Sequence, residues 1–132
     1  MDKLYIPGDL VMVKKSALQF AKDKIFKVIS SLSGGFVKVV MLNDSSTTYS
    51  ISNNAVRPIP LTSEILKKNG WMLYRMHHWF IEKECLKLSL LELDNHSWYV
   101  YIGDNLIRRY MHSVSDLQHI LFCLGINSEM EV

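Results

Sequence analysis

The sequence predicts an α+β protein: a small antiparallel β-barrel over residues 1–57, followed by an antiparallel sheet with two short helices over residues 58–132. Short β-branched and aromatic segments, separated by Gly, Asn, Asp and Ser, recur in both halves and are typical of strands joined by tight turns. Two segments, 63–69 and 114–124, instead carry helix caps and apolar residues at helical spacing. A pair of prolines separates the two halves.

The boundary is predicted at Pro58 and Pro60, because proline fixes φ, donates no backbone hydrogen bond and favours an extended residue before it. A strand can run up to this point, but a helix cannot continue through it. Thr62 is a good N-cap for the next helix, over 63–69, and Gly70 is suited to end it. A helix of about two turns is unstable alone, so we expect it to dock on the rest of the fold.

In the first half, Gly34-Gly35 is a strong hairpin signal, because glycine adopts positive φ readily. The segment 16–23 fits either a helical turn or a short strand. Strands are expected over 10–13, 25–29, 36–42, 47–51 and 55–57. Five short strands within about fifty residues favour a small closed antiparallel barrel.

The opening segment Pro7-Gly8-Asp9-Leu10-Val11 and the later Asn54-Ala55-Val56-Arg57-Pro58 resemble the first and last strands of SH3-like barrels. The resemblance is to an architecture and covers roughly the first 58 residues. SH3-like barrels bind peptides, nucleic acids or nothing at all, so it implies a fold without a function.

In the second half, the apolar and aromatic segments 71–76, 79–81, 86–91, 98–102 and 106–110 are expected to form an antiparallel meander. His77-His78 is expected to be a turn, and the shift of leucine phase after Leu90 indicates either a bulge or two buried faces. Ser113 and Asp116 form a capping pair for the last helix, which Gly125 ends. Its buried stripe is expected to be Val114, Leu117, Leu121 and Leu124, and the tail 127–132 fits a short final strand.

Several segments of this half occur together in a recognisable order: Pro60-Leu61-Thr62 with Glu64-Ile65-Leu66, then Asn69-Gly70-Trp71, then a helix containing Leu117-Gln118-His119, and a closing Glu129-Met130-Glu131-Val132. This order resembles that of small, uncharacterised proteins from gut-bacterial phages and mobile elements. The resemblance covers most of 58–132 and implies an accessory protein of the bacterial cytoplasm. It carries no established activity and no catalytic residue.

Apolar residues make up 48% of the chain and charged residues 21%, a balance typical of globular domains. No apolar run is long enough to cross a bilayer, and the first residues lack a signal-peptide pattern, so we expect a cytoplasmic protein without membrane contact. Cys85 and Cys123 lie within apolar segments and are expected to be buried, reduced thiols. No cofactor-binding motif, nucleophile motif or phosphate-binding glycine loop is present, which favours a non-enzymatic function.

An aromatic group in the second half is richer than the core of a small sheet requires. If one face of the sheet is open to solvent, some of these rings form a protein-binding surface, for a partner protein or for a second copy in a homo-oligomer. If both faces are covered, the rings belong to the core. The candidate residues are Trp71, Tyr74, Trp79, Trp98, Tyr99 and Tyr101.

Charge is distributed unevenly, and this distribution supports a second hypothesis. Residues 1–57 hold eight Lys and Arg against four Asp and Glu, whereas residues 58–132 hold seven against nine. The basic half suits weak binding of nucleic acid, although such lysines often only keep a small barrel soluble. The lysines concerned are Lys14, Lys15, Lys22, Lys24, Lys27 and Lys38.

Histidines provide the third and weakest hypothesis, a metal-dependent enzyme. Asp116 and His119 would share a helix face near His112, but a metal ion would need a further ligand from His77, His78 or His96. The usual zinc-binding spacings are absent, so the sequence predicts no metal site.

Overall fold

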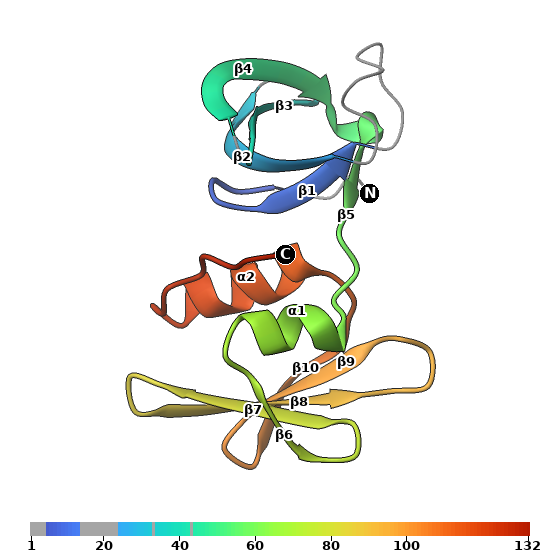
Figure 1. Ribbon diagram of the computed structural model, residues 1–132, viewed down its shortest axis with the longest axis vertical. Helices are drawn as coiled ribbons and strands as arrows, with labels where there is room; N and C mark the ends of the chain where they lie inside the picture. Colours follow the sequence, from blue (N-terminus) through green and yellow to red (C-terminus); the bar gives the residue numbers. More distant parts are fainter. Residues whose placement is uncertain (1–4, 14–23, 33, 43) are drawn as a thin grey trace. The chain divides into compact units, whose positions relative to one another are not determined.

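The computed structural model describes residues 5–13, 24–32, 34–42 and 44–132 (Figure 1). The expected element over 16–23 lies outside the described residues. The chain divides into two compact units, Met1–Ile59 and Pro60–Val132, each built around an antiparallel sheet. Among the described residues both α-helices belong to the second unit, here called unit 2, and this arrangement confirms the α+β class.

The first unit, unit 1, contains a five-stranded antiparallel sheet in the order β4-β3-β2-β1-β5. Its core is formed by alternate residues of the strands, including Val11, Phe26, Val28, Val37 and Val39, all almost fully buried. The elements are β1 (Leu10–Val13), β2 (Ile25–Leu32), β3 (Phe36–Met41), β4 (Asp44–Ser52), a 3-10 helix (Asn53–Ala55) and β5 (Val56–Pro58). Within the described residues no pairing joins the edge strands β4 and β5, so the closed barrel stays a prediction.

Unit 2 has a second five-stranded antiparallel sheet, in the order β10-β9-β8-β7-β6, and two helices that lie on the same face of it (Figure 1). The strands form the predicted meander, in which each one pairs with its neighbour in sequence. The elements are α1 (Ser63–Lys68), β6 (Met72–Arg75), β7 (His78–Lys83), β8 (Leu86–Glu92), β9 (Trp98–Ile102), β10 (Asn105–Met111) and α2 (Val114–Cys123).

Both helices begin as the sequence predicts. The Thr62 hydroxyl accepts a hydrogen bond from the N–H of Ile65 at 3.3 Å, and the Ser113 hydroxyl accepts one from the N–H of Asp116 at 3.1 Å. Each cap satisfies one of the free N–H groups of a first helical turn. Gly125, at φ +72°, follows the last turn of α2.

The helices bury Leu66, Val114, Leu117 and Leu121 on the side of the sheet that they cover. Leu124, predicted to complete this stripe, is only half-buried because it is the C-cap residue that follows the last residue of α2. The strands contribute the remaining buried residues of this core, which include Trp79, Leu88, Leu90, Trp98, Val100 and Met111.

The C-terminal tail is held by side chains rather than by a strand. The Asn69 amide donates to the carbonyl of Glu131 and accepts from the N–H of Glu131, both at 2.8 Å. The same Asn69 nitrogen donates to the carbonyl of Ile65 at 2.7 Å, and Gln118 donates to the carbonyl of Ser128 at 3.0 Å. The predicted final strand is therefore wrong, because one amide side chain provides the pairing that a neighbouring strand would.

Two further expectations are wrong for local reasons. The turn between β6 and β7 is formed by Met76 and His77, and His78 already belongs to β7. Cys85 and Cys123 are exposed rather than buried: Cys85 lies in the β7–β8 hairpin turn at φ +69°, and Cys123 lies at the end of α2.

Candidate interaction face

Alternation along β7, β8 and β9 divides their side chains between the two faces of the unit 2 sheet. Direct cross-strand partners lie on the same face, so the registers trace rows across it. One row, Leu73, Trp79, Leu90 and Val100, contains residues of the buried core. The neighbouring row faces the opposite way and consists of Met72, Phe80, Ser89, Tyr101 and Leu106.

We call the side opposite α1 and α2 the open face, because neither helix of unit 2 covers it (Figure 1). The aromatic residues at the edges of this face are the most exposed: Tyr74 is 64% and Tyr110 54% accessible. Phe80 and Tyr101, nearer the middle of the sheet, are half-buried. The open face is defined by the residues Met72, Tyr74, Arg75, His78, Phe80, Glu82, Lys87, Ser89, Leu91, Tyr99, Tyr101, Leu106 and Tyr110.

The aromatic rings of the open face contact one another in two pairs. Tyr74 and Phe80 pack edge to face with their ring centroids 6.1 Å apart, and Tyr99 and Tyr110 do so at 5.6 Å. Such pairs prefer these perpendicular arrangements because of the ring quadrupole. The Arg75 guanidinium lies 5.0 Å from the centroid of the Tyr74 ring, so a cation stacks on one of the exposed rings.

A hydrogen bond between two tyrosines of this face affects the titration of Tyr99. Hydrogen bonding to Tyr110 is the largest cause that raises the pKa of Tyr99 above its ordinary value, and desolvation adds to it. Arg109, whose guanidinium carbon lies 6.0 Å from the Tyr99 ring centroid, acts in the opposite direction. The phenol of Tyr99 is therefore neutral at physiological pH and acts as a hydrogen-bonding group.

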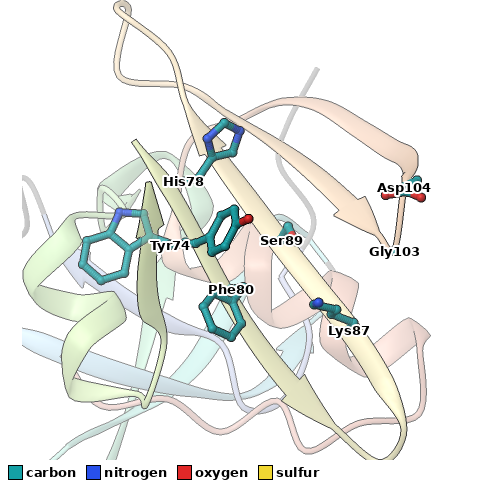
Figure 2. Close-up of a pocket in the computed structure, with 8 residues that line it drawn as sticks. Tyr74, His78, Phe80, Lys87, Ser89, Gly103 and Asp104 are labelled. Atoms are coloured by element: carbon teal, nitrogen blue, oxygen red, sulfur yellow. The ribbon is translucent and has the colours of Figure 1, made fainter. Parts of the chain in front are cut away.

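A hollow of about 360 Å³ lies on the open face between β6 and the β9–β10 turn (Figure 2). Tyr74 and Phe80 form one side, while Lys87 and Ser89 project from β8 on the other (Figure 2). The hollow is lined by Tyr74, His78, Trp79, Phe80, Lys87, Ser89, Gly103 and Asp104.

The structure separates the predicted aromatic group into two sets. Tyr74, Tyr99 and Tyr101 lie on the open face, as a surface requires. In contrast, Trp71, Trp79 and Trp98 are 5%, 4% and 0% exposed, so the tryptophans belong to the core, although Trp79 also lines the hollow. In β9 the reason is the alternation of the strand: Trp98 and Val100 point inward, and Tyr99 and Tyr101 point outward.

Sequence reasoning missed Phe80 and Tyr110, which complete the two ring pairs. The alternation in Trp79-Phe80-Ile81 could have placed Phe80 opposite Trp79. For Tyr110 no such signal exists, because β10 contains two register shifts and Tyr110 itself has a φ of +57°.

The lysines proposed for nucleic acid are only partly within the described residues. Lys14, Lys15 and Lys22 lie outside them. Lys27 and Lys38 lie on the side of the unit 1 sheet opposite its core and are half-buried, whereas Lys24 is exposed. Nothing in their arrangement favours nucleic acid over solvent.

The histidine hypothesis receives no support from the geometry. The Asp116 carboxylate accepts a hydrogen bond from the N–H of His112 at 3.3 Å and lies 3.8 Å from the Arg108 guanidinium, so it serves the start of α2. In the described part of the chain, no cluster of three or more His, Cys, Asp or Glu is placed to hold a metal ion.

No helix among the described residues has both the length and the apolar character needed to cross a membrane. Comparison of the chain with protein-family models, with curated proteins and with solved structures finds no match. Function must therefore be argued from the open face itself.

Proposed function

We propose that this protein is a non-enzymatic protein-interaction module that binds its partner through the open face of unit 2. The observation that carries the proposal is the phase of β7 and β9, which places Phe80, Tyr99 and Tyr101 on the side that the helices leave uncovered. Tyrosine and arginine are enriched at protein interfaces, because a ring or a guanidinium provides contact area and polar bonds together.

The apolar residues at the β6 edge support the same surface. Met72 and Tyr74 of the open face are 61% and 64% exposed, and Met76, in the turn that follows β6, is 79% exposed. Exposed apolar residues gathered in one place mark binding surfaces more often than singly scattered ones do. The opposite edge, β10, instead carries Arg108 and Arg109 and two register shifts, features that discourage contact with another strand.

We also propose that unit 1 has the fold of an SH3-like barrel. The strand order β4-β3-β2-β1-β5 and the 3-10 helix between the last two strands support it. Its role in the proposal is structural, since fold alone assigns no ligand.

We further propose that the protein serves a phage or mobile element in the bacterial cytoplasm, on the basis of the segments that it shares with such proteins. The hydrogen bonds between Asn69 and Glu131 give a physical reason why two distant segments of that pattern occur together.

The proposal is tested by affinity capture with three baits: the unaltered protein, Tyr74→Ser and Phe122→Ser. Tyr74 and Phe122 are 64% and 63% exposed, so both changes remove a similarly exposed ring without opening the core, but Phe122 lies on α2. We expect a partner that is retained by the unaltered protein and by Phe122→Ser but lost with Tyr74→Ser. Light scattering at increasing concentration shows whether that partner is a second copy. Equal retention by all three baits contradicts the proposal.

A further inference from the structure

The hollow on the open face combines features that point to a more specific partner than a flat surface does. Its volume of about 360 Å³ is near the lower end of the range for ligand pockets, about 300–1,000 Å³. It therefore suits one large side chain rather than a segment of several residues. The edge-to-face pair of Tyr74 and Phe80 provides an aromatic wall, against which another ring can pack in the same manner.

A cation lies at the other side of the hollow. The Lys87 ammonium group projects from β8 toward the space between the rings and the β9–β10 turn (Figure 2). Glu82 lies directly across from Lys87 in the β7–β8 register, yet within the described part of the chain no carboxylate is within ion-pair distance of this ammonium. An ammonium group that is free of internal partners can bind an anion of the ligand.

An acidic group lines the same hollow. The N–H of Gly103 donates to the carbonyl of Lys87 at 2.8 Å, and this bond ties the β9–β10 turn, with Asp104, to β8. The Asp104 carboxylate therefore lines the same hollow as Lys87. A doubly charged anion such as phosphate would be repelled by Asp104, whereas a singly charged carboxylate with an adjacent N–H donor complements both groups.

From the ring pair and the two opposite charges, we propose that the hollow binds the C-terminal aromatic residue of a partner polypeptide. The ring packs against Tyr74 and Phe80, the terminal carboxylate accepts hydrogen bonds from Lys87 and Ser89, and the last backbone N–H donates to Asp104. This inference rests on the proposed function and names the part of the partner that the open face recognises.

The test uses the full-length protein and three probes: the tetrapeptide Ac-Gly-Ser-Gly-Phe with a free carboxyl terminus, the same peptide as its C-terminal amide, and free phenylalanine. Binding is followed by amide chemical shifts in NMR titrations. We expect saturable shifts around Tyr74, Phe80, Lys87 and Asp104 with the acid, and binding of the amide weakened by about tenfold or more, as expected when a charge-assisted hydrogen bond is lost.

Two variants locate the carboxylate. Lys87→Met removes the ammonium group but keeps the apolar stem. We expect this variant to bind the peptide with a free carboxyl terminus no more tightly than the unaltered protein binds the amide. Lys68→Met is the matched control, because Lys68 is an exposed lysine on α1, away from the hollow, and it should leave binding unchanged.

The proposal is overturned if acid and amide peptides bind equally, if the shifts lie elsewhere, or if no probe binds. Equal or tighter binding of free phenylalanine also overturns it, because the site would then serve a small amino acid rather than a chain terminus. If no peptide binds while Tyr74→Ser still abolishes partner capture, the proposed interaction function is retained and only the proposed recognition of a C-terminus is rejected. If Tyr74→Ser has no effect on capture, the proposed function itself fails.

Discussion

The hydrogen bonds between Asn69 and the C-terminal tail predict how much the free energy of unfolding of unit 2 changes when Asn69 is replaced. Asn69→Ala removes three hydrogen bonds, one to the carbonyl of Ile65 and two to the backbone of Glu131. Each is worth about 0.5–1.5 kcal/mol net, and the two tail bonds are exposed. We therefore expect the free energy of unfolding of unit 2 to fall by about 2 kcal/mol, toward the lower end of the summed range.

A double-mutant cycle isolates the tail bonds. A chain that ends at Ser128 lacks Glu131 but keeps the carbonyl that Gln118 binds. In that background Asn69→Ala should remove only the bond to Ile65 and lower the free energy of unfolding by about 0.5–1 kcal/mol, which leaves a coupling free energy of about 1–1.5 kcal/mol between Asn69 and the tail.

The measurement is urea unfolding followed by tryptophan fluorescence, which reports unit 2 specifically, because all three tryptophans of the chain lie within it. Asn105→Ala, at an exposed position in β10, serves as the control and should change stability by no more than about 0.5 kcal/mol. If Asn69→Ala costs the same with and without the tail, the Asn69–Glu131 pair contributes nothing and the reasoning is refuted.

Three further outcomes follow from other local features. Thr62→Ala should lower the free energy of unfolding of unit 2 by about 1 kcal/mol in the same assay, because the N–H of Ile65 loses its cap, and Thr62→Ser should restore most of it. Gly125→Ala should cost about 1–2 kcal/mol purely through its backbone, since φ is +72° and no atom lies within 4 Å of the added methyl group; an unchanged stability would contradict this. Tyr110→Phe should lower the pKa of Tyr99 toward its ordinary value, measured by ultraviolet absorbance during an alkaline titration. Because the folded pKa of Tyr99 is raised, its contribution to stability is present below the unfolded pKa and is lost as pH rises through the folded pKa, so Tyr110→Phe should reduce that alkaline loss.

The parts of the fold that could be predicted are those set by neighbouring residues. Thr62 and Ser113 cap helices because the donors that they satisfy are only a few positions away. The strand Trp98–Ile102 was expected at the bounds that it has. In both cases the determining interactions are local, so the sequence carries them directly.

Other features depend on partners distant in the chain or on backbone geometry that has no residue signature. Glu84 and Cys85 form a hairpin turn with both φ angles positive but without glycine, so nothing in the sequence indicated that Cys85 is exposed. The shift of leucine phase after Leu90 is compatible with a bulge or with two buried faces; β8 pairs without interruption, and Leu91 lies half-buried on the open face.

The candidate site was predictable in composition but not in placement. An excess of aromatic residues indicated a surface, and Tyr74, Tyr99 and Tyr101 do lie together on it. Which rings face solvent depends on the side of the sheet that the helices cover, and alternation alone is symmetric between the two sides. The sequence therefore leaves the tryptophans and the tyrosines together as candidates for either the surface or the core, although burial removes more apolar area from water for an indole than for a phenol.

The five residues of β9 contribute to both faces of the sheet. Trp98 and Val100 pack in the core, whereas Tyr99 and Tyr101 lie on the open face. Insertion or deletion of one residue inside β9 would move each following side chain to the other face of the sheet. Such a change would disrupt the core and the proposed binding surface together. Sequence changes within this strand are therefore tolerated only as replacements of one side chain by another at the same position.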